Sequence, residues 1–183
     1  MKTATHYLTV TMAVIGLTMM LSAPAVKAKP DTGPKNKVTL LQTALAVSAA
    51  TGDFNTLIAA VLAADPAVVM LLSDNGQHTV FAPDDAAFAA LGLTPDNIGD
   101  PEVIDQDTLT GILIYHVVKG RKLAEDVVAS DTLNTLRRGK TGFLAQDGGV
   151  LTDNLGRTAT IIVTDVEASN GVIHAINSVV LPE

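Results

Sequence analysis

The sequence predicts an α+β domain, with helices in its first half and an antiparallel sheet in its second half. Apolar residues up to about residue 118 recur with the period of amphipathic helices, and helix-capping residues precede several of these runs. The later part changes to short stretches rich in β-branched residues, separated by turn signals that include Asn-Gly. Helices followed by hairpin-linked strands are typical of α+β folds.

The first 28 residues are predicted to be a signal peptide. A basic start at Lys2 precedes an apolar run over residues 7–21, followed by small residues of the kind that signal peptidase accepts. Cleavage fits after Ala28 or after Ala25. The apolar run of about 15 residues is shorter than the roughly 20 that span a bilayer, which argues against a retained anchor. We therefore expect a periplasmic or secreted protein with no membrane span in its mature form.

Composition limits the partners of the mature chain. The leader holds 2 of the 12 Lys and Arg residues and none of the 19 Asp and Glu residues, so 10 against 19 remain and the net charge is −9. This charge argues against nucleic acid as a partner. The chain has no cysteine and therefore no disulfide. Residues 29–37 are predicted to be a flexible linker, and residues 38–183 one domain, which we expect to be monomeric.

Local capping signals delimit the first helices. Thr39 with Gln42 forms a capping box ahead of an apolar run. Asp53 is expected to cap a second helix, and the Asp-Pro pair at 65–66 starts a third.

A short strand is expected over residues 78–83, with Asp84 capping the helix that follows. Asp107 is expected to cap a longer helix with Leu113 and His116 on its apolar stripe, and this helix runs into a strand. Further strands are expected over residues 132–136, 141–145, 158–168 and 172–181.

Motifs for catalysis are weak. The Gly-Lys-Thr at 139–141 lacks the leading glycine of a phosphate loop, because Asn134 stands there, and no serine lies in a Gly-x-Ser-x-Gly elbow. His116, His174 and Asp85 could form a metal or catalytic site, but they have no short ligand spacing. Histidines on apolar faces favour a structural role. We therefore expect no enzymatic activity, no metal and no cofactor.

Three blocks carry a resemblance to a known family. They are TVFAPDDAAFAAL at 79–91, ILIYHVVKG at 112–120 and ASNGVIHAINSVVLP at 168–182. In order and spacing they resemble the signatures of the fasciclin-1 family (FAS1, the fasciclin/βig-h3 domain), and the resemblance covers residues 38–183. It implies a wedge of antiparallel β-strands with helices packed around it, in an extracytoplasmic, non-catalytic adhesion module of the single-domain bacterial type.

The resemblance also implies roles for particular residues. In animal members the Tyr-His region is implicated in integrin binding, which places partner binding here at Tyr115 and His116; an integrin partner itself does not carry over. The flanking candidates are Ile112, Leu113 and Val117. The helical pattern directs Leu113 and His116 inward and leaves the Tyr115 hydroxyl free to reach solvent or a partner.

The other signature blocks hold the residues expected to be structural, which are Asp84, Asp85, Asn170, Gly171 and His174. Asp84 stands where the family usually has Thr or Asn, and it can still cap a helix. Asn177 replaces the usual acid, so a neutral hydrogen bond is expected there.

These observations predict an exported, non-enzymatic cell-adhesion or extracellular protein-interaction module. Its partner would be an extracellular or surface protein or a matrix component. One alternative is a metal-binding or enzymatic protein that uses His116, His174 and Asp85. Another is a structural component of the envelope or of a biofilm matrix, with no discrete ligand.

Overall fold

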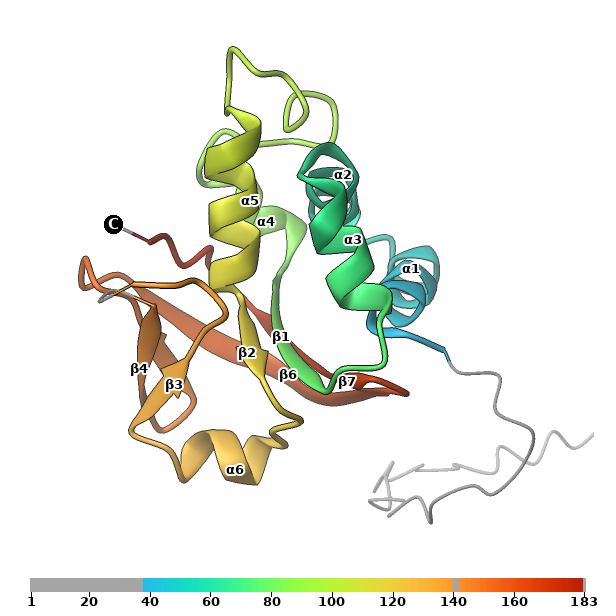
Figure 1. Ribbon diagram of the computed structural model, residues 1–183. Helices are drawn as coiled ribbons and strands as arrows, with labels where there is room; N and C mark the ends of the chain where they lie inside the picture. Colours follow the sequence, from blue (N-terminus) through green and yellow to red (C-terminus); the bar gives the residue numbers. More distant parts are fainter. Residues whose placement is uncertain (1–37, 140–141, 183) are drawn as a thin grey trace, which may run out of the picture. The chain divides into compact units, whose positions relative to one another are not determined.

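The computed structural model describes residues 38–139 and 142–182, so the predicted leader and linker lie outside the described residues (Figure 1). The first part is mainly helical, with β1 and β2 between helices, and only strands follow α6. In chain order they are α1 (Leu40–Thr51), α2 (Asn55–Ala63), α3 (Pro66–Ser73), β1 (His78–Pro83), α4 (Asp85–Ala89), α5 (Gln106–Tyr115), β2 (Val117–Lys119), α6 (Ala124–Val128), β3 (Thr132–Asn134), β4 (Phe143–Asp147), β5 (Val150–Thr152), β6 (Thr158–Ala168) and β7 (Gly171–Ile176).

The strands of the described residues form one mixed sheet in the order β2-β1-β7-β6-β5-β4-β3. From β3 to β7 each strand pairs antiparallel with the next, as predicted for the second half of the chain. The exception is β1, which pairs parallel with β7 from His78–Gly171 to Pro83–Ile176. Val118 of β2 also bridges Thr135, next to β3, so the sheet curls until its two ends touch.

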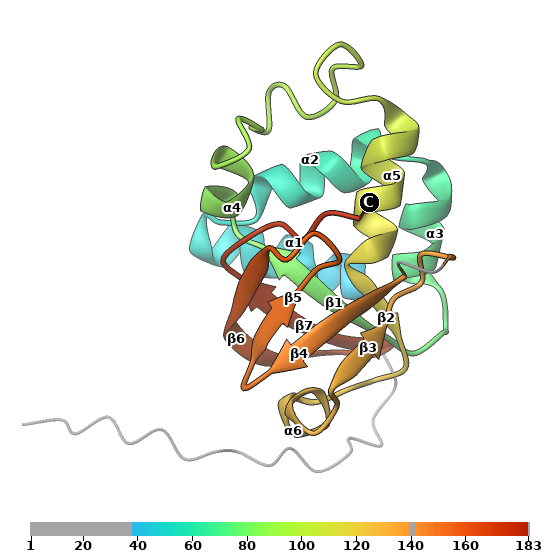
Figure 2. The same cartoon turned by 90° about the vertical axis from the view of Figure 1, so that its left-hand side faces the viewer.

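The curled sheet separates two hydrophobic cores. The larger core lies between the sheet and helices α1–α5, and includes Leu57, Phe88, Leu109 and Leu113. The smaller core lies inside the curl and contains Phe81 and Tyr115 together with apolar residues of β3, β4 and β5. In Figure 2 helices α2 and α5 lie above the strands and α6 lies below them. The α+β fold is confirmed.

Three of the predicted caps are present. The capping box at Thr39 is formed, Asp65 accepts from Ala67 N at 2.7 Å, and Asp84 accepts from Ala87 N at 2.7 Å. These side chains satisfy backbone N–H groups that have no partner within the helix.

Two predicted caps are wrong. Helix α5 is capped by Asp105, which accepts from Thr108 N at 2.9 Å, and Asp107 lies in its first turn. Helix α2 starts after Phe54, which has a left-handed backbone (φ 66°) and no capping side chain. Asp53 instead accepts from Asp85 N, so its carboxylate serves another element.

Within the described residues no single helix is both long and apolar enough to cross a membrane. Only α2 and α3 taken together reach that length and composition, and they are bent by 117°.

Candidate functional site

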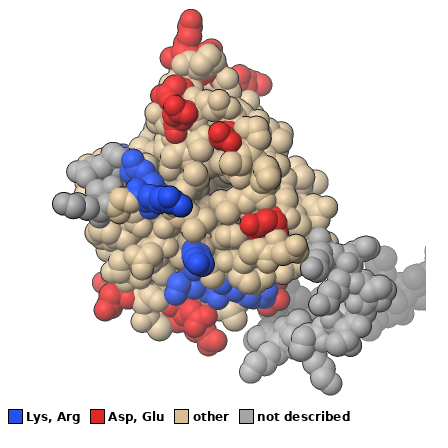
Figure 3. Space-filling view, in the orientation of Figure 1, with Lys and Arg blue, Asp and Glu red and all other residues tan. Residues whose placement is uncertain are grey.

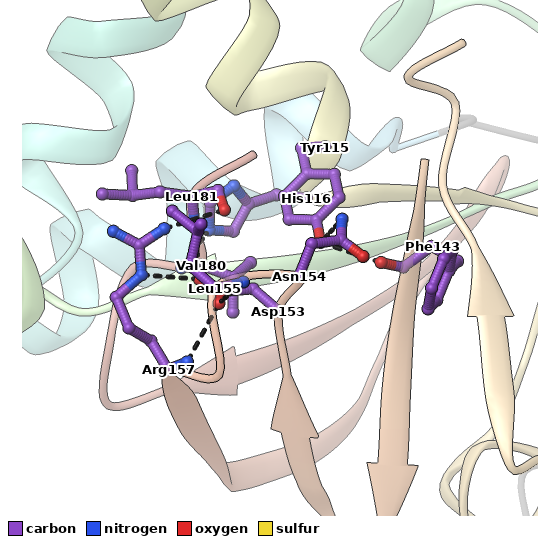
Figure 4. A network of polar contacts seen from close by, with 9 residues as sticks. All are labelled: Tyr115, His116, Phe143, Asp153, Asn154, Leu155, Arg157, Val180 and Leu181. Atoms are coloured by element: carbon purple, nitrogen blue, oxygen red, sulfur yellow. Dashed lines mark hydrogen bonds and ion pairs between the residues drawn. The ribbon is translucent and has the colours of Figure 1, made fainter. Parts of the chain in front are cut away.

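The Tyr115 side chain lies in the smaller core, against the prediction that its hydroxyl reaches solvent. Tyr115 ends α5 and is fully buried. Its hydroxyl donates to the carbonyl of Phe143 (2.8 Å) and accepts from the side-chain amide of Asn154 (3.1 Å), as Figure 4 shows. Burial raises the pKa of Tyr115, and the bond with Asn154 opposes that rise only in part. The hydroxyl therefore ties α5 to β4 and to the β5–β6 turn.

His116 follows directly and connects α5 to the chain's C-terminal segment. Its Nδ1 lies 2.8 Å from the carbonyl of Ile112, and Val180 N lies 3.3 Å from its Nε2. A carbonyl can only accept and a backbone N–H can only donate, so Nδ1 carries the proton and Nε2 is the acceptor. Burial lowers the pKa of His116 to about 4, although the bond to Ile112 acts in the opposite direction. The inward orientation predicted for Leu113 and His116 is confirmed.

A buried carboxylate holds the same C-terminal segment from the other side. The Asp153 side chain is 0% exposed and pairs with Arg157 Nε at 2.8 Å. It also accepts from the backbone N–H groups of Leu155, Arg157 and Leu181, at 2.9, 2.9 and 3.1 Å. Arg157 Nη2 donates to the carbonyl of Leu181 (2.9 Å; Figure 4). Burial alone raises the pKa of Asp153, but the bonds from Arg157 and Leu181 outweigh it and the pKa is lowered.

The contacts of Asp153 and Arg157 with Leu181, here named the Asp153 clamp, were not predicted from the sequence. Its local signal is an aspartate four residues before an arginine, across a turn that contains Gly156. Such a pair is also typical of a solvent-exposed turn, and the third participant, Leu181, is 24 residues away from Arg157.

The solvent-facing side of this network is a shallow depression, here named the α5 hollow. Its volume is about 480 Å³, and it is lined by Asp107, Thr108, Gly111, Ile112, Arg137, Leu181 and Pro182. Of the five predicted partner-binding residues only Ile112 is part of its lining and partly exposed; Leu113, Tyr115, His116 and Val117 are buried. In the space-filling view basic side chains lie at mid-height on the left and lower down in the centre, while acidic ones lie at the top, at the bottom and at mid-height on the right (Figure 3).

Asp85 has a different role, at the start of α2. Its carboxylate accepts from Thr56 N at 2.8 Å, and from both Asn55 N (3.2 Å) and the Asn55 side-chain amide (3.1 Å). Burial alone raises the pKa of Asp85, but these bonds outweigh it and the pKa is lowered. In return, Asp53 accepts from Asp85 N at 2.8 Å and also from Phe54 N at 2.8 Å. Asp85 thus caps α2 from α4, and Asp53 joins the residue before α2 to the start of α4.

Replacing Asp85 by alanine should therefore lower the free energy of unfolding by about 1–2 kcal/mol, the usual range for the loss of a helix cap. Urea unfolding followed by far-ultraviolet circular dichroism measures this change. The matched control is Asp107→Ala, an exposed acid in a helical first turn, for which we expect a change of about 0.5 kcal/mol or less. Equal losses of unfolding free energy in the two variants would contradict the role of Asp85 as the cap of α2.

The third signature block is joined to distant backbone. Asn170 accepts from Leu40 N at 2.7 Å and donates to the carbonyls of Leu72 (3.1 Å) and Asp74 (2.9 Å). A Cβ at Gly171 would overlap the carbonyl oxygen of His78, so only glycine permits the close approach of β7 to β1.

His174 is fully buried and stacks on Phe81, with their ring centroids 5.6 Å apart. Its Nε2 lies 2.9 Å from the carbonyl of Lys122, and its Nδ1 accepts from Asp165 N at 3.2 Å. Both ring nitrogens are therefore used by the backbone, as they are in His116.

The alternative of a metal site made of His116, His174 and Asp85 is wrong for this structure. The three side chains bond to separate stretches of backbone. Across residues 38–139 and 142–182, no three histidine, aspartate or glutamate side chains are grouped so that they could hold a metal ion. The polar atoms of the predicted site are used to hold elements together.

Fold and site together define an α+β module whose signature residues are built into the scaffold. The fasciclin domain model matches residues 52–182. The chain belongs to the fasciclin domain family.

Relatives from several organisms agree with this membership. The chain is 43% identical to protein sll1483 of Synechocystis sp. over 141 residues, which cover 76% of this chain and 73% of that protein. It is 32% identical to the immunogenic protein MPT70 of Mycobacterium tuberculosis, over 82% of this chain and 75% of that protein. It is 38% identical to the transforming growth factor-beta-induced protein ig-h3 of Sus scrofa, over 71% of this chain but only 18% of that protein.

A solved structure has the same fold. A FAS1 domain pair from the insect cell adhesion molecule fasciclin I aligns with a TM-score of 0.50 at 20% identity, covering 66% of this chain and 42% of that chain.

Proposed function

We propose that this protein is an exported, non-catalytic adhesion module that binds an extracellular protein or matrix component through the α5 hollow. Membership of the fasciclin family, the predicted leader of residues 1–28 and the likeness to a domain of a cell adhesion molecule support this role. Mature cleavage after Ala28 or Ala25 would release the domain to the periplasm or the medium.

The observation that carries the proposal is the position of Ile112. It is partly exposed in the α5 hollow, one helical turn before the buried Tyr115 and His116. Apolar atoms of Leu181 and Pro182 lie beside it, while Asp107 and Arg137 add polar groups to the lining. An apolar centre with polar groups around it is the usual composition of a protein contact surface.

The buried hydrogen-bond network beneath the α5 hollow holds its lining residues in place. Tyr115, His116 and Asp153 fix the end of α5 and the C-terminal segment through four bonds to backbone groups of other segments or of the same helix. The side chain of Arg157 pairs with Asp153 in addition. A surface held in place before binding loses little conformational entropy when the partner docks. The Tyr-His pair would then act by positioning the contact residues rather than by touching the partner.

The experiment measures binding of the labelled mature chain to the native cell surface or extracellular matrix. Ile112→Glu should weaken binding by about tenfold or more, because a charge in the apolar centre of a contact surface is strongly unfavourable. The matched control is Val128→Glu, an exposed valine on α6, which should bind as the wild type does. Circular dichroism must show both variants folded.

Two results would contradict the proposal. Undiminished binding by folded Ile112→Glu would remove the α5 hollow as the contact surface. If sedimentation instead shows that the chain associates only with itself, the structural matrix alternative would account for the protein better.

A further inference from the structure

A second surface feature lies on another part of the domain, where α1 crosses β6 and β7. It is an apolar groove of about 150 Å³, here named the α1 groove. One wall is the face of α1 that carries Ala44, Val47 and Thr51, and the sheet side includes Ala82, Val163 and Ala175. Small alanine side chains on both walls leave the space open, whereas protein interiors are normally packed without such gaps.

A second cavity adjoins the groove. Its volume is about 40 Å³, and it shares Ala44, Leu57, Ala82 and Ile173 with the lining of the groove. Leu72 and His116 also line this cavity, so apolar space lies on both sides of the shared residues.

The sheet is irregular at the mouth of the groove. The pairing of β6 with β7 shifts register on both sides of Val163, and Asp165 has a left-handed backbone (φ 60°). Val163 remains 48% exposed at this point. β-Bulges of this kind occur preferentially beside functional sites, where they redirect side chains.

The residues that line the groove disfavour a charged ligand. Thr51 is its one polar side chain, and the Thr51 hydroxyl already donates to the carbonyl of Val47 at 2.9 Å. No Lys or Arg lines the groove, so nothing in it would pair with a carboxylate or phosphate.

From these observations we propose that the α1 groove binds an uncharged, chain-like apolar lipid, which enters end-on between α1 and the β6–β7 pair. Cavities lined by apolar side chains take up apolar molecules. This site is separate from the α5 hollow and shares no lining residue with it, so the proposal stands independently of the adhesion function.

The test uses the neutral fluorescent probe N-phenyl-1-naphthylamine, with dodecanol and dodecanoate as competitors. The full mature chain should bind the probe, and dodecanol should displace it at lower concentration than dodecanoate. Ala44→Leu fills the groove and should weaken probe binding about tenfold or more, as expected when an apolar pocket loses room. The control is Ala46→Leu on the exposed face of α1, which should bind like the wild type.

A second variant tests the proposal in case Ala44→Leu fails to fold. Val163→Thr keeps the shape of an exposed side chain at the groove mouth while adding a hydroxyl, so it should fold normally and bind the probe several-fold more weakly. Absence of probe binding to the wild type would overturn the proposal. Equal binding by Ala44→Leu and Ala46→Leu, or displacement by dodecanoate as readily as by dodecanol, would overturn it as well.

Discussion

Replacing Asp153 by alanine is expected to lower the free energy of unfolding by about 3 kcal/mol, more than any other single change considered for this protein. The carboxylate is fully buried and accepts from three backbone N–H groups as well as from Arg157. Its removal leaves those donors without an acceptor. The Arg157 side chain, which is 41% exposed, can regain water and adds less to the loss.

Urea unfolding at neutral pH measures this effect. Asp147→Ala removes an exposed carboxylate from β4 and serves as the control, with an expected change of about 0.5 kcal/mol or less. Asp153→Asn should fall between the two, because it keeps one acceptor oxygen. A loss in Asp153→Ala no larger than that in Asp147→Ala would mean that the clamp does not stabilise the fold.

Acidification should destabilise the domain through His116. Its pKa in the fold is about 4, against 6.5 for an ordinary histidine, because burial disfavours the charged ring. Between these values the unfolded chain binds more protons than the folded chain. The stabilisation is therefore complete above pH 6.5 and is lost as the pH falls toward 4, by about 3 kcal/mol in total. Protonation also removes the acceptor for Val180 N.

The measurement is the free energy of unfolding from pH 8 to pH 4, in the wild type and in His116→Asn. The variant should be less stable at pH 7 but should show a flatter dependence between pH 6.5 and 4. His116→Ala should lose about 1–3 kcal/mol at neutral pH, as expected for a buried hydrogen-bonded group. If the wild type and His116→Asn have the same pH dependence, the titration of His116 is not its cause. Asp85 and Asp153, with lowered pKa values, add losses only at lower pH.

The parts of the fold that depend on neighbouring residues were predictable from the sequence. Thr39, Asp65 and Asp84 act within three residues of their own position, so their patterns predicted three helix starts correctly. Asp53 and Asp107 show the limit of such patterns. The sequence does not show that Asp105, two residues before Asp107, is the one that caps α5. It also does not show that the Asp53 carboxylate binds the backbone of Asp85 at the start of α4.

The position of the Tyr115 side chain could not be predicted from the helical period alone. The pattern of α5 has one apolar stripe, so Tyr115 was predicted to lie outside the core. In the structure this helix end contacts a second core, formed by strands that follow about thirty residues later, and Phe143 accepts the Tyr115 hydroxyl. The parallel pairing of β1 with β7 was unpredicted for the same reason, since His78 and Gly171 are far apart in the chain.

The position of β7 sets the order in which this protein can fold. Among the described residues β7 is the last strand in sequence, but it lies near the middle of the sheet, between β1 and β6. A chain still being synthesised has no partner for the inner edge of β1 until residue 176 has emerged, so the sheet cannot be completed from the N-terminus onward. Long-range pairings of this kind slow folding. The sheet can therefore close only once β7 is available, and a chain cut before Gly171 would leave the facing edges of β1 and β6 unpaired and prone to aggregation.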